Sequence, residues 1–164
     1  MLFACKSENE KQKSEYNQKG NELIQQLILE ENCECILEIS KENLKELEEI
    51  ENPRVNFDSI YLEKLLFKNQ KELDSINNLS KNFSLDFKFL KEHNIKVIRR
   101  DSLRILKNDI NFNTKTCRKG LTYFTKPIFN KKFNVAIINY GPYGMCCGIP
   151  RTTFEYKNNK WIRK

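Results

Sequence analysis

The sequence predicts an α+β fold in which N-terminal helices pack on a C-terminal antiparallel β-meander. Before His93, apolar residues recur mainly at helical spacing. After Gly120, short runs rich in β-branched and aromatic residues alternate with turn residues, as in antiparallel strands. Hydrophobic residues make up 39% of the 164 positions, enough to bury a core, so we expect one domain over residues 21–164.

The first predicted helix covers residues 22–31, and a strand follows at Cys33–Ile39. The helix has four apolar residues at helical spacing: Leu23, Ile24, Leu27 and Ile28. A second helix is expected to start after an N-cap in Ser40–Asn43 and to end at Asn52-Pro53. We expect five glutamates here to form a solvated face rather than a catalytic carboxylate cluster: Glu42, Glu46, Glu48, Glu49 and Glu51.

The middle of the chain predicts short helices around residues 58–67, 70–78 and 85–92. The segment Phe83–Phe89 alternates like a strand, but its continuation suits a helix end, so a helix is favoured. Ile95–Arg99 then resembles a strand.

Four strands are expected in the last third, at residues 121–125, 133–140, 152–156 and 160–162. Asn158-Asn159 is a two-residue turn that tolerates positive φ, so the last two strands should form a terminal hairpin. Trp161 is expected to anchor the last strand in the core.

Leu2-Phe3-Ala4-Cys5 matches the site that a lipoprotein signal peptidase recognises, with an aliphatic residue at −3, a small residue at −1 and then cysteine. We therefore expect lipidation of Cys5. A working signal needs a basic region and roughly 7–15 apolar residues before the cleavage site. Only Met1–Ala4 precede Cys5, so either the natural chain starts upstream of Met1, or it was trimmed, or the match is accidental.

Residues 1–20 are expected to be a truncated lipoprotein signal followed by a disordered tether, because Lys6–Glu15 is polar and contains no aliphatic residue. No span reaches the ~20 apolar residues needed to cross a bilayer. The protein would therefore bind a membrane through lipid at Cys5, in the bacterial cell envelope, at the outer membrane or at a periplasmic face. The alternative is a cytoplasmic protein without lipid.

Charge divides the chain into two halves. Residues 1–80 carry 10 Lys/Arg and 17 Asp/Glu, a net −7, whereas residues 81–164 carry 19 and 5, a net +14. If the basic half gathers its cations on one surface, it should bind an anionic envelope component or a protein partner; the alternative is that the halves neutralise one another. The candidate cations are Lys96, Arg99, Arg100, Arg104, Lys107, Arg118 and Lys119. Nucleic acid is disfavoured, because no nucleic-acid-binding motif accompanies the charge.

Six cysteines favour an oxidising compartment. With Cys5 lipidated, an odd number remains for one or two disulfides: Cys33, Cys35, Cys117, Cys146 and Cys147. Cys33 and Cys35 would face the same side of a strand and would more easily pair with other partners than with each other. At most one of the adjacent Cys146 and Cys147 should be bridged. The sequence does not choose the connectivity.

The segment Tyr140–Pro150 is a candidate binding loop, because a long connection inside a hairpin often carries binding. Its candidate contact residues are Tyr140, Tyr143, Met145, Cys146 and Cys147. The alternative is a structural turn held to the body by one cysteine.

No catalytic or metal site is predicted. His93 is the only histidine, and its place at an expected helix C-terminus suits interaction with the helix dipole. The spacings Cys33-x-Cys35 and Cys146-Cys147 differ from the usual zinc pattern of Cys-x₂₋₄-Cys. Serine-hydrolase and phosphate-binding motifs are absent, and no cofactor is expected.

The C-terminal third resembles small uncharacterised lipoproteins of the Bacteroidetes envelope. The matching segments are Lys126-Pro127-Ile128-Phe129-Asn130, Val135-Ala136-Ile137-Ile138, Cys147-Gly148 and Asn158-Asn159-Lys160-Trp161. Where that pattern has Cys-Gly-x-Leu-Cys-Gly, Tyr143 stands in the place of the first cysteine and Cys146 in that of the leucine, so a disulfide within this turn is not expected. The resemblance implies an envelope address and no activity.

Together these features predict a non-enzymatic envelope lipoprotein that binds a partner or serves a structural role. One alternative is a small thiol-dependent enzyme that uses an exposed thiol near Cys146-Cys147; the other is a cytosolic module without lipid.

Overall fold

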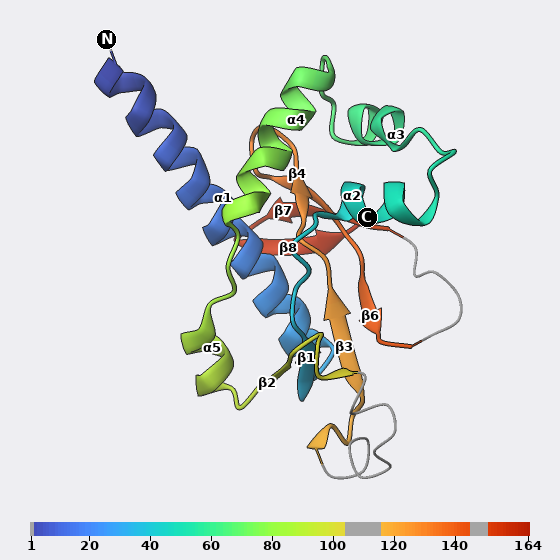
Figure 1. The fold of residues 1–164 in the computed structure, drawn as a ribbon. Coiled ribbons are helices and arrows are strands. Elements are labelled where there is room, and N and C mark those ends of the chain that lie inside the picture. Colours follow the sequence, from blue (N-terminus) through green and yellow to red (C-terminus); the bar gives the residue numbers. More distant parts are fainter. Residues whose placement is uncertain (1, 104–115, 145–150) are drawn as a thin grey trace.

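The computed structural model describes residues 2–103, 116–144 and 151–164 (Figure 1). The described helices are α1 (Leu2–Glu30), α2 (Leu44–Glu51), α3 (Phe57–Lys64), α4 (Gln70–Leu79), the 3₁₀ turn η1 (Ser80–Asn82) and α5 (Phe87–Glu92). The described strands are β1 (Cys35–Leu37), β2 (Lys96–Ile98), β3 (Leu121–Phe124), β4 (Ile128–Phe129), β5 (Val135–Ile138), β6 (Tyr140–Pro142), β7 (Thr152–Lys157) and β8 (Lys160–Arg163).

The predicted α+β class, with helices mostly N-terminal and an antiparallel C-terminal sheet, is confirmed. This sheet has the order β4-β5-β7-β8, and each neighbouring pair is antiparallel. The predicted terminal hairpin is also confirmed, because Asn158 and Asn159 adopt φ of 51° and 60° between β7 and β8. Trp161 is 2% exposed, as a core anchor should be.

A second four-stranded sheet, of order β2-β1-β3-β6, was not predicted. In it β1 pairs in parallel with β2 on one side and with β3 on the other. The expected strand 133–140 is divided between the two sheets at Asn139, where β5 ends and β6 begins. Thr125 holds this crossing point: its N–H donates to the Asn139 carbonyl (2.9 Å), and its Oγ1 accepts from the Asn139 N–H (3.0 Å).

The structure corrects the expectation of a disordered tether over residues 1–20, because α1 is continuous from Leu2 to Glu30. Tyr16 lies at the centre of the core, 1% exposed, and its hydroxyl donates to the Pro127 carbonyl (2.5 Å). Gly20 is not a boundary either, since a Cβ there would lie 2.6 Å from the Phe83 ring. Glycine permits this close approach of α1 to the segment after η1.

Side-chain caps begin the shorter helices. Asn43 and Glu46 form a capping box at α2, and Asn56, Asn69 and Asp86 cap α3, α4 and α5. The ambiguous segment before α5 is extended up to Asp86 and helical from Phe87. Residues 83–86 are therefore extended, as the alternating pattern suggests, and the predicted helix begins only at Phe87.

The main core lies between α1, the antiparallel sheet and helices α2–α4 (Figure 1). Among its fully buried large side chains are Tyr16, Tyr61, Phe124, Phe129 and Trp161. Figure 1 shows α2, α3 and α4 at one end of the molecule and α5 with β2 nearer the other. The segment after β1 contacts the segments after β2 and β3, because the Glu38 carbonyl accepts from Arg100 Nε and the Lys41 carbonyl accepts from Lys126 Nζ.

Candidate functional site

A pocket of about 680 Å³ lies at the carboxyl ends of the three parallel strands. Glu38–Lys41 follow β1, Arg99 follows β2 and Lys126 follows β3, and all of them line it. Parallel strands place their carboxyl ends at one edge of a sheet, which is where open α/β sheets bind ligands. The volume is within the range of small-molecule sites.

Lys126 is the most unusual lining residue, because this lysine is only 5% exposed. Its Nζ donates to the Lys41 carbonyl at 2.5 Å, and within the described ranges no carboxylate oxygen lies within 4.0 Å of it. Burial lowers the pKa of Lys126, opposed by the charges of Glu46 and Glu42. An ammonium has three N–H donors, so this group retains donor capacity toward the pocket.

Three more cations line the same pocket: Lys41, Lys81 and Arg99. The only acidic lining residue among those described is Glu38. Its carboxylate accepts from the Arg100 N–H (3.2 Å), and its carbonyl accepts from Arg100 Nε (2.8 Å). Arg99 lies 3.4 Å from Asp101, but both side chains are about 70% exposed, so this pair leaves Arg99 available to a ligand.

The remaining wall of the pocket is apolar, formed by Ile39, Phe83, Leu85, Phe87 and Val97. Four of these are partly buried and pack against the core, whereas Phe87 is 66% exposed. The pocket therefore combines four cationic groups with an aliphatic and aromatic surface.

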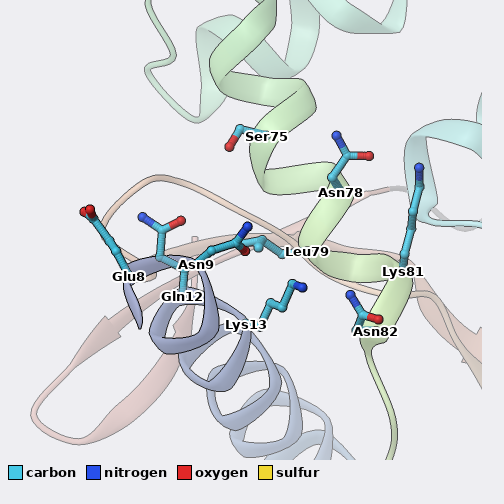
Figure 2. Close-up of a pocket in the computed structure, with 9 residues that line it drawn as sticks. All are labelled: Glu8, Asn9, Gln12, Lys13, Ser75, Asn78, Leu79, Lys81 and Asn82. Atoms are coloured by element: carbon cyan, nitrogen blue, oxygen red, sulfur yellow. The ribbon is translucent and has the colours of Figure 1, made fainter. Parts of the chain in front are cut away.

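A second, more polar groove of about 600 Å³ lies between the first turns of α1 and the α4–η1 segment (Figure 2). Figure 2 shows Gln12 and Lys13 of α1 facing Leu79 and Asn82. Among the described residues its lining consists of amides, the Ser75 hydroxyl, Leu79 and three charged side chains, with no histidine or cysteine. Lys81 lines both this groove and the basic pocket.

The structure connects two of the candidate cysteines. Cys35 and Cys117 form a disulfide with a Cα–Cα distance of 5.6 Å, which joins β1 to the turn before β3. Cys33 is a buried free thiol whose Sγ lies 3.4 Å from Thr122 Oγ1. Burial raises the pKa of Cys33, which argues against a reactive thiolate there. Cys146 and Cys147 lie outside the described residues.

Residues 140–144 of the candidate binding loop are described. Tyr140 belongs to β6 and stacks on Phe124 (centroids 5.9 Å apart), so it contributes to packing. Tyr143 is 38% exposed and its N–H donates to the Leu121 carbonyl. Met145, like the two cysteines after it, lies outside the described residues, and so does the rest of the loop to Pro150. The side chain of Cys5 is also not described.

The candidate basic surface is divided. Lys96 and Lys119 gather around Glu34 near the start of β1, where Lys96 Nζ lies 4.0 Å from its carboxylate and the Lys119 N–H donates to it (3.3 Å). Arg99 lies at the other end of β2, in the basic pocket. Arg104 and Lys107 lie outside the described residues. The cations brought together around Arg99 are lysines that sequence reasoning did not group with it.

One glutamate of the predicted solvated face is buried, contrary to expectation. Glu48 is 7% exposed, accepts from the Tyr61 hydroxyl (2.5 Å) and pairs with Arg151 Nε (2.9 Å). Burial raises the pKa of Glu48. This cluster is an internal ion pair that joins α2 and α3 to the start of β7.

His93 caps α5, as predicted, and its Nδ1 lies 2.9 Å from the Phe89 carbonyl. Its ring stacks on that of Phe89, and no nucleophile in the described ranges is bonded to it. Within the described part of the chain, no group of three His, Cys, Asp or Glu side chains is placed to hold a metal. None of the described helices is long and apolar enough to span a membrane.

A scan against protein-family models, a search of curated proteins and a search of solved structures found no match to this chain. The resemblance to Bacteroidetes envelope lipoproteins therefore stays a prediction from the residues.

Proposed function

We propose that this chain is a non-enzymatic binding domain that holds an anionic ligand in the pocket at the carboxyl ends of β1, β2 and β3. The observation that carries the proposal is Lys126, a buried ammonium at the pocket wall without a carboxylate within 4.0 Å in the described ranges. Burying an unpaired charge costs several kcal/mol. An anion bound at Lys126 and Arg99 would offset that cost.

Binding is favoured over catalysis by the side chains that line the pocket. The described lining contains no histidine, cysteine or aspartate, and the hydroxyl of Ser40 is engaged with Glu42. General acid–base or nucleophilic catalysis needs a reactive group and a partner that activates it. Recognition of charge and shape needs neither.

An anionic probe tests this proposal directly. Anilinonaphthalene sulfonate should bind the wild type with a fluorescence increase, and Arg99→Glu should weaken binding about tenfold or more, because reversal replaces attraction by repulsion. Lys126→Met should weaken it as well. The matched control is Lys64→Glu, which reverses an exposed charge on α3 outside the pocket.

Binding should also weaken as salt rises from 0.01 M to 0.15 M, where the screening length falls from about 30 Å to about 8 Å. Equal affinity of the Arg99 and Lys64 variants, or no binding by the wild type, would contradict an anion site in this pocket.

We further propose that the domain is held at the bacterial envelope by lipid on Cys5. The match of Leu2–Cys5 to a lipoprotein signal-peptidase site supports this location, and the Cys35–Cys117 disulfide supports an oxidising compartment. In this arrangement α1 would connect the lipid directly to the folded body, because Cys5 lies on the helix that contains Tyr16.

The full-length product, expressed with an upstream signal, should partition into the detergent phase, and Cys5→Ser should abolish this. A single acyl chain binds membranes only marginally, so stable anchoring requires multiple acylation at Cys5. The measurement is detergent phase separation of both forms followed by mass determination. Equal partitioning of the two forms would contradict lipidation at Cys5 and would leave the proposed anion site untouched.

A further inference from the structure

The apolar wall of the basic pocket is an ordered surface. Phe83 and Leu85, in the extended segment before α5, and Phe87, the first residue of α5, line this wall. Phe83 also packs on Tyr16 of α1, with ring centroids 6.0 Å apart. The backbone between these residues is bonded to α1: the Ser84 N–H donates to Asn17 Oδ1 (3.1 Å), and the Asp86 N–H donates to Asn21 Oδ1 (2.7 Å).

A third hydrogen bond strengthens this attachment, because Asn21 Nδ2 donates to the Ser84 carbonyl (2.9 Å). The backbone is thus fixed to α1 before any ligand arrives, and such preorganisation reduces the entropy lost on binding. Phe87 nevertheless remains 66% exposed beside the cations. A small hydrophilic anion would leave this aromatic surface uncovered.

We infer that the ligand is an anionic amphiphile, with a carboxylate, sulfate or phosphate headgroup at Lys126 and Arg99 and an apolar chain against the Phe83–Phe87 wall. This inference deepens the proposed anion site and depends on it. The charge of the pocket matches the headgroup, and the apolar lining matches the chain. Free fatty acids and single-chain phosphate lipids share this chemistry.

Chain length is the property to vary. Calorimetric titration of the full chain with butanoate, octanoate and dodecanoate, below their aggregation concentrations, should show affinity rising about fourfold per buried methylene. Butanoate and octanoate, which differ by four methylenes, should then differ roughly 200-fold in affinity. Dodecyl phosphate distinguishes the two headgroups: tighter binding than dodecanoate indicates a phosphate lipid, and weaker binding a fatty acid.

Dodecyltrimethylammonium carries the same chain on a cation and should bind at least tenfold more weakly than dodecanoate. Phe87→Ser should weaken octanoate about tenfold and leave butanoate within twofold. Ile50→Ser is the matched control, because Ile50 is also exposed (70%) and does not line the pocket. Thermal melting should show that both variants remain folded.

Equal affinity of the wild type for butanoate and octanoate would overturn the amphiphile inference while leaving the anion site intact. Equal binding of the cationic and anionic dodecyl compounds would overturn it as well. Failure of every carboxylate, together with failure of anilinonaphthalene sulfonate, would remove the proposed function itself.

Discussion

Replacing Cys35 and Cys117 together by alanine is expected to lower the free energy of unfolding by about 3–5 kcal/mol. The two cysteines are 82 residues apart in the sequence, and the loop-closure relation gives about 4.5 kcal/mol for a loop of that size. Both are fully buried, so their removal also loosens the small cluster with Leu37 and Leu121. Urea unfolding of oxidised protein measures the difference.

Two comparisons identify the disulfide as the cause. In dithiothreitol, the free energy of unfolding of the wild type should be close to that of the double variant. Cys33→Ala should lower it by only about 1 kcal/mol or less, because this change removes one buried sulfur and no crosslink. If the wild type had the same urea midpoint with and without reductant, the crosslink would be absent.

Tyr16→Ala is expected to destabilise the protein by about 3–5 kcal/mol. The Tyr16 ring packs edge-on against Phe83, Phe129 and Phe133, with centroids 5.3–6.4 Å apart. Burial raises the pKa of Tyr16, so its hydroxyl stays protonated and donates to the Pro127 carbonyl. Tyr16→Phe retains the ring and should lose only about 1 kcal/mol. Urea unfolding monitored by circular dichroism measures both losses.

Phe87→Ser is the control, because this aromatic residue is mostly exposed and should cost little stability. If residues 1–20 were a disordered tether, Tyr16→Ala would change the free energy of unfolding as little as the control does. That result would also contradict the direct connection that we propose between Cys5 and the folded body.

The parts of the fold that local chemistry specifies could be predicted. Asn43 and the residues after it predict the start of α2, and Asn158-Asn159 predict the last hairpin. Helix capping and positive φ depend on a few neighbouring residues, so they can be read from the sequence. The parallel sheet could not be predicted this way. Its strands β1 and β2 have three residues each and pair across about 60 positions, so nothing local names their partners.

The polar composition near the N-terminus predicts a disordered tether. Composition is an average over many residues and does not reveal one buried side chain such as Tyr16. Lys6–Glu15 is polar, yet it is rich in residues that favour helices. Tyr16 continues the spacing of Leu23 and Leu27 toward the N-terminus, and this signal could have extended the predicted helix. The close contact of Gly20 with Phe83 depends on the tertiary structure and is invisible in the sequence.

The basic pocket was missed for the same reason as the parallel sheet. Lys41, Arg99 and Lys126 each follow a strand closely, and that position becomes informative only once the strands are known to be parallel. An antiparallel meander would have placed successive strand ends at opposite edges. The alternation of apolar residues around Leu85 is visible in the sequence, but the attachment of Ser84 and Asp86 to α1 is a tertiary contact that the sequence does not show.

Mapping amide chemical shifts during titration with octanoate locates the ligand without altering the protein. If the ligand occupies the basic pocket, the largest shifts will lie at Glu38–Lys41, Ser84–Phe87, Arg99 and Lys126, and the α3 residues around Lys64 will be unchanged. Shifts spread over the exposed lysines and arginines, or concentrated in Tyr140–Pro150, would contradict a ligand site at the carboxyl ends of the parallel strands.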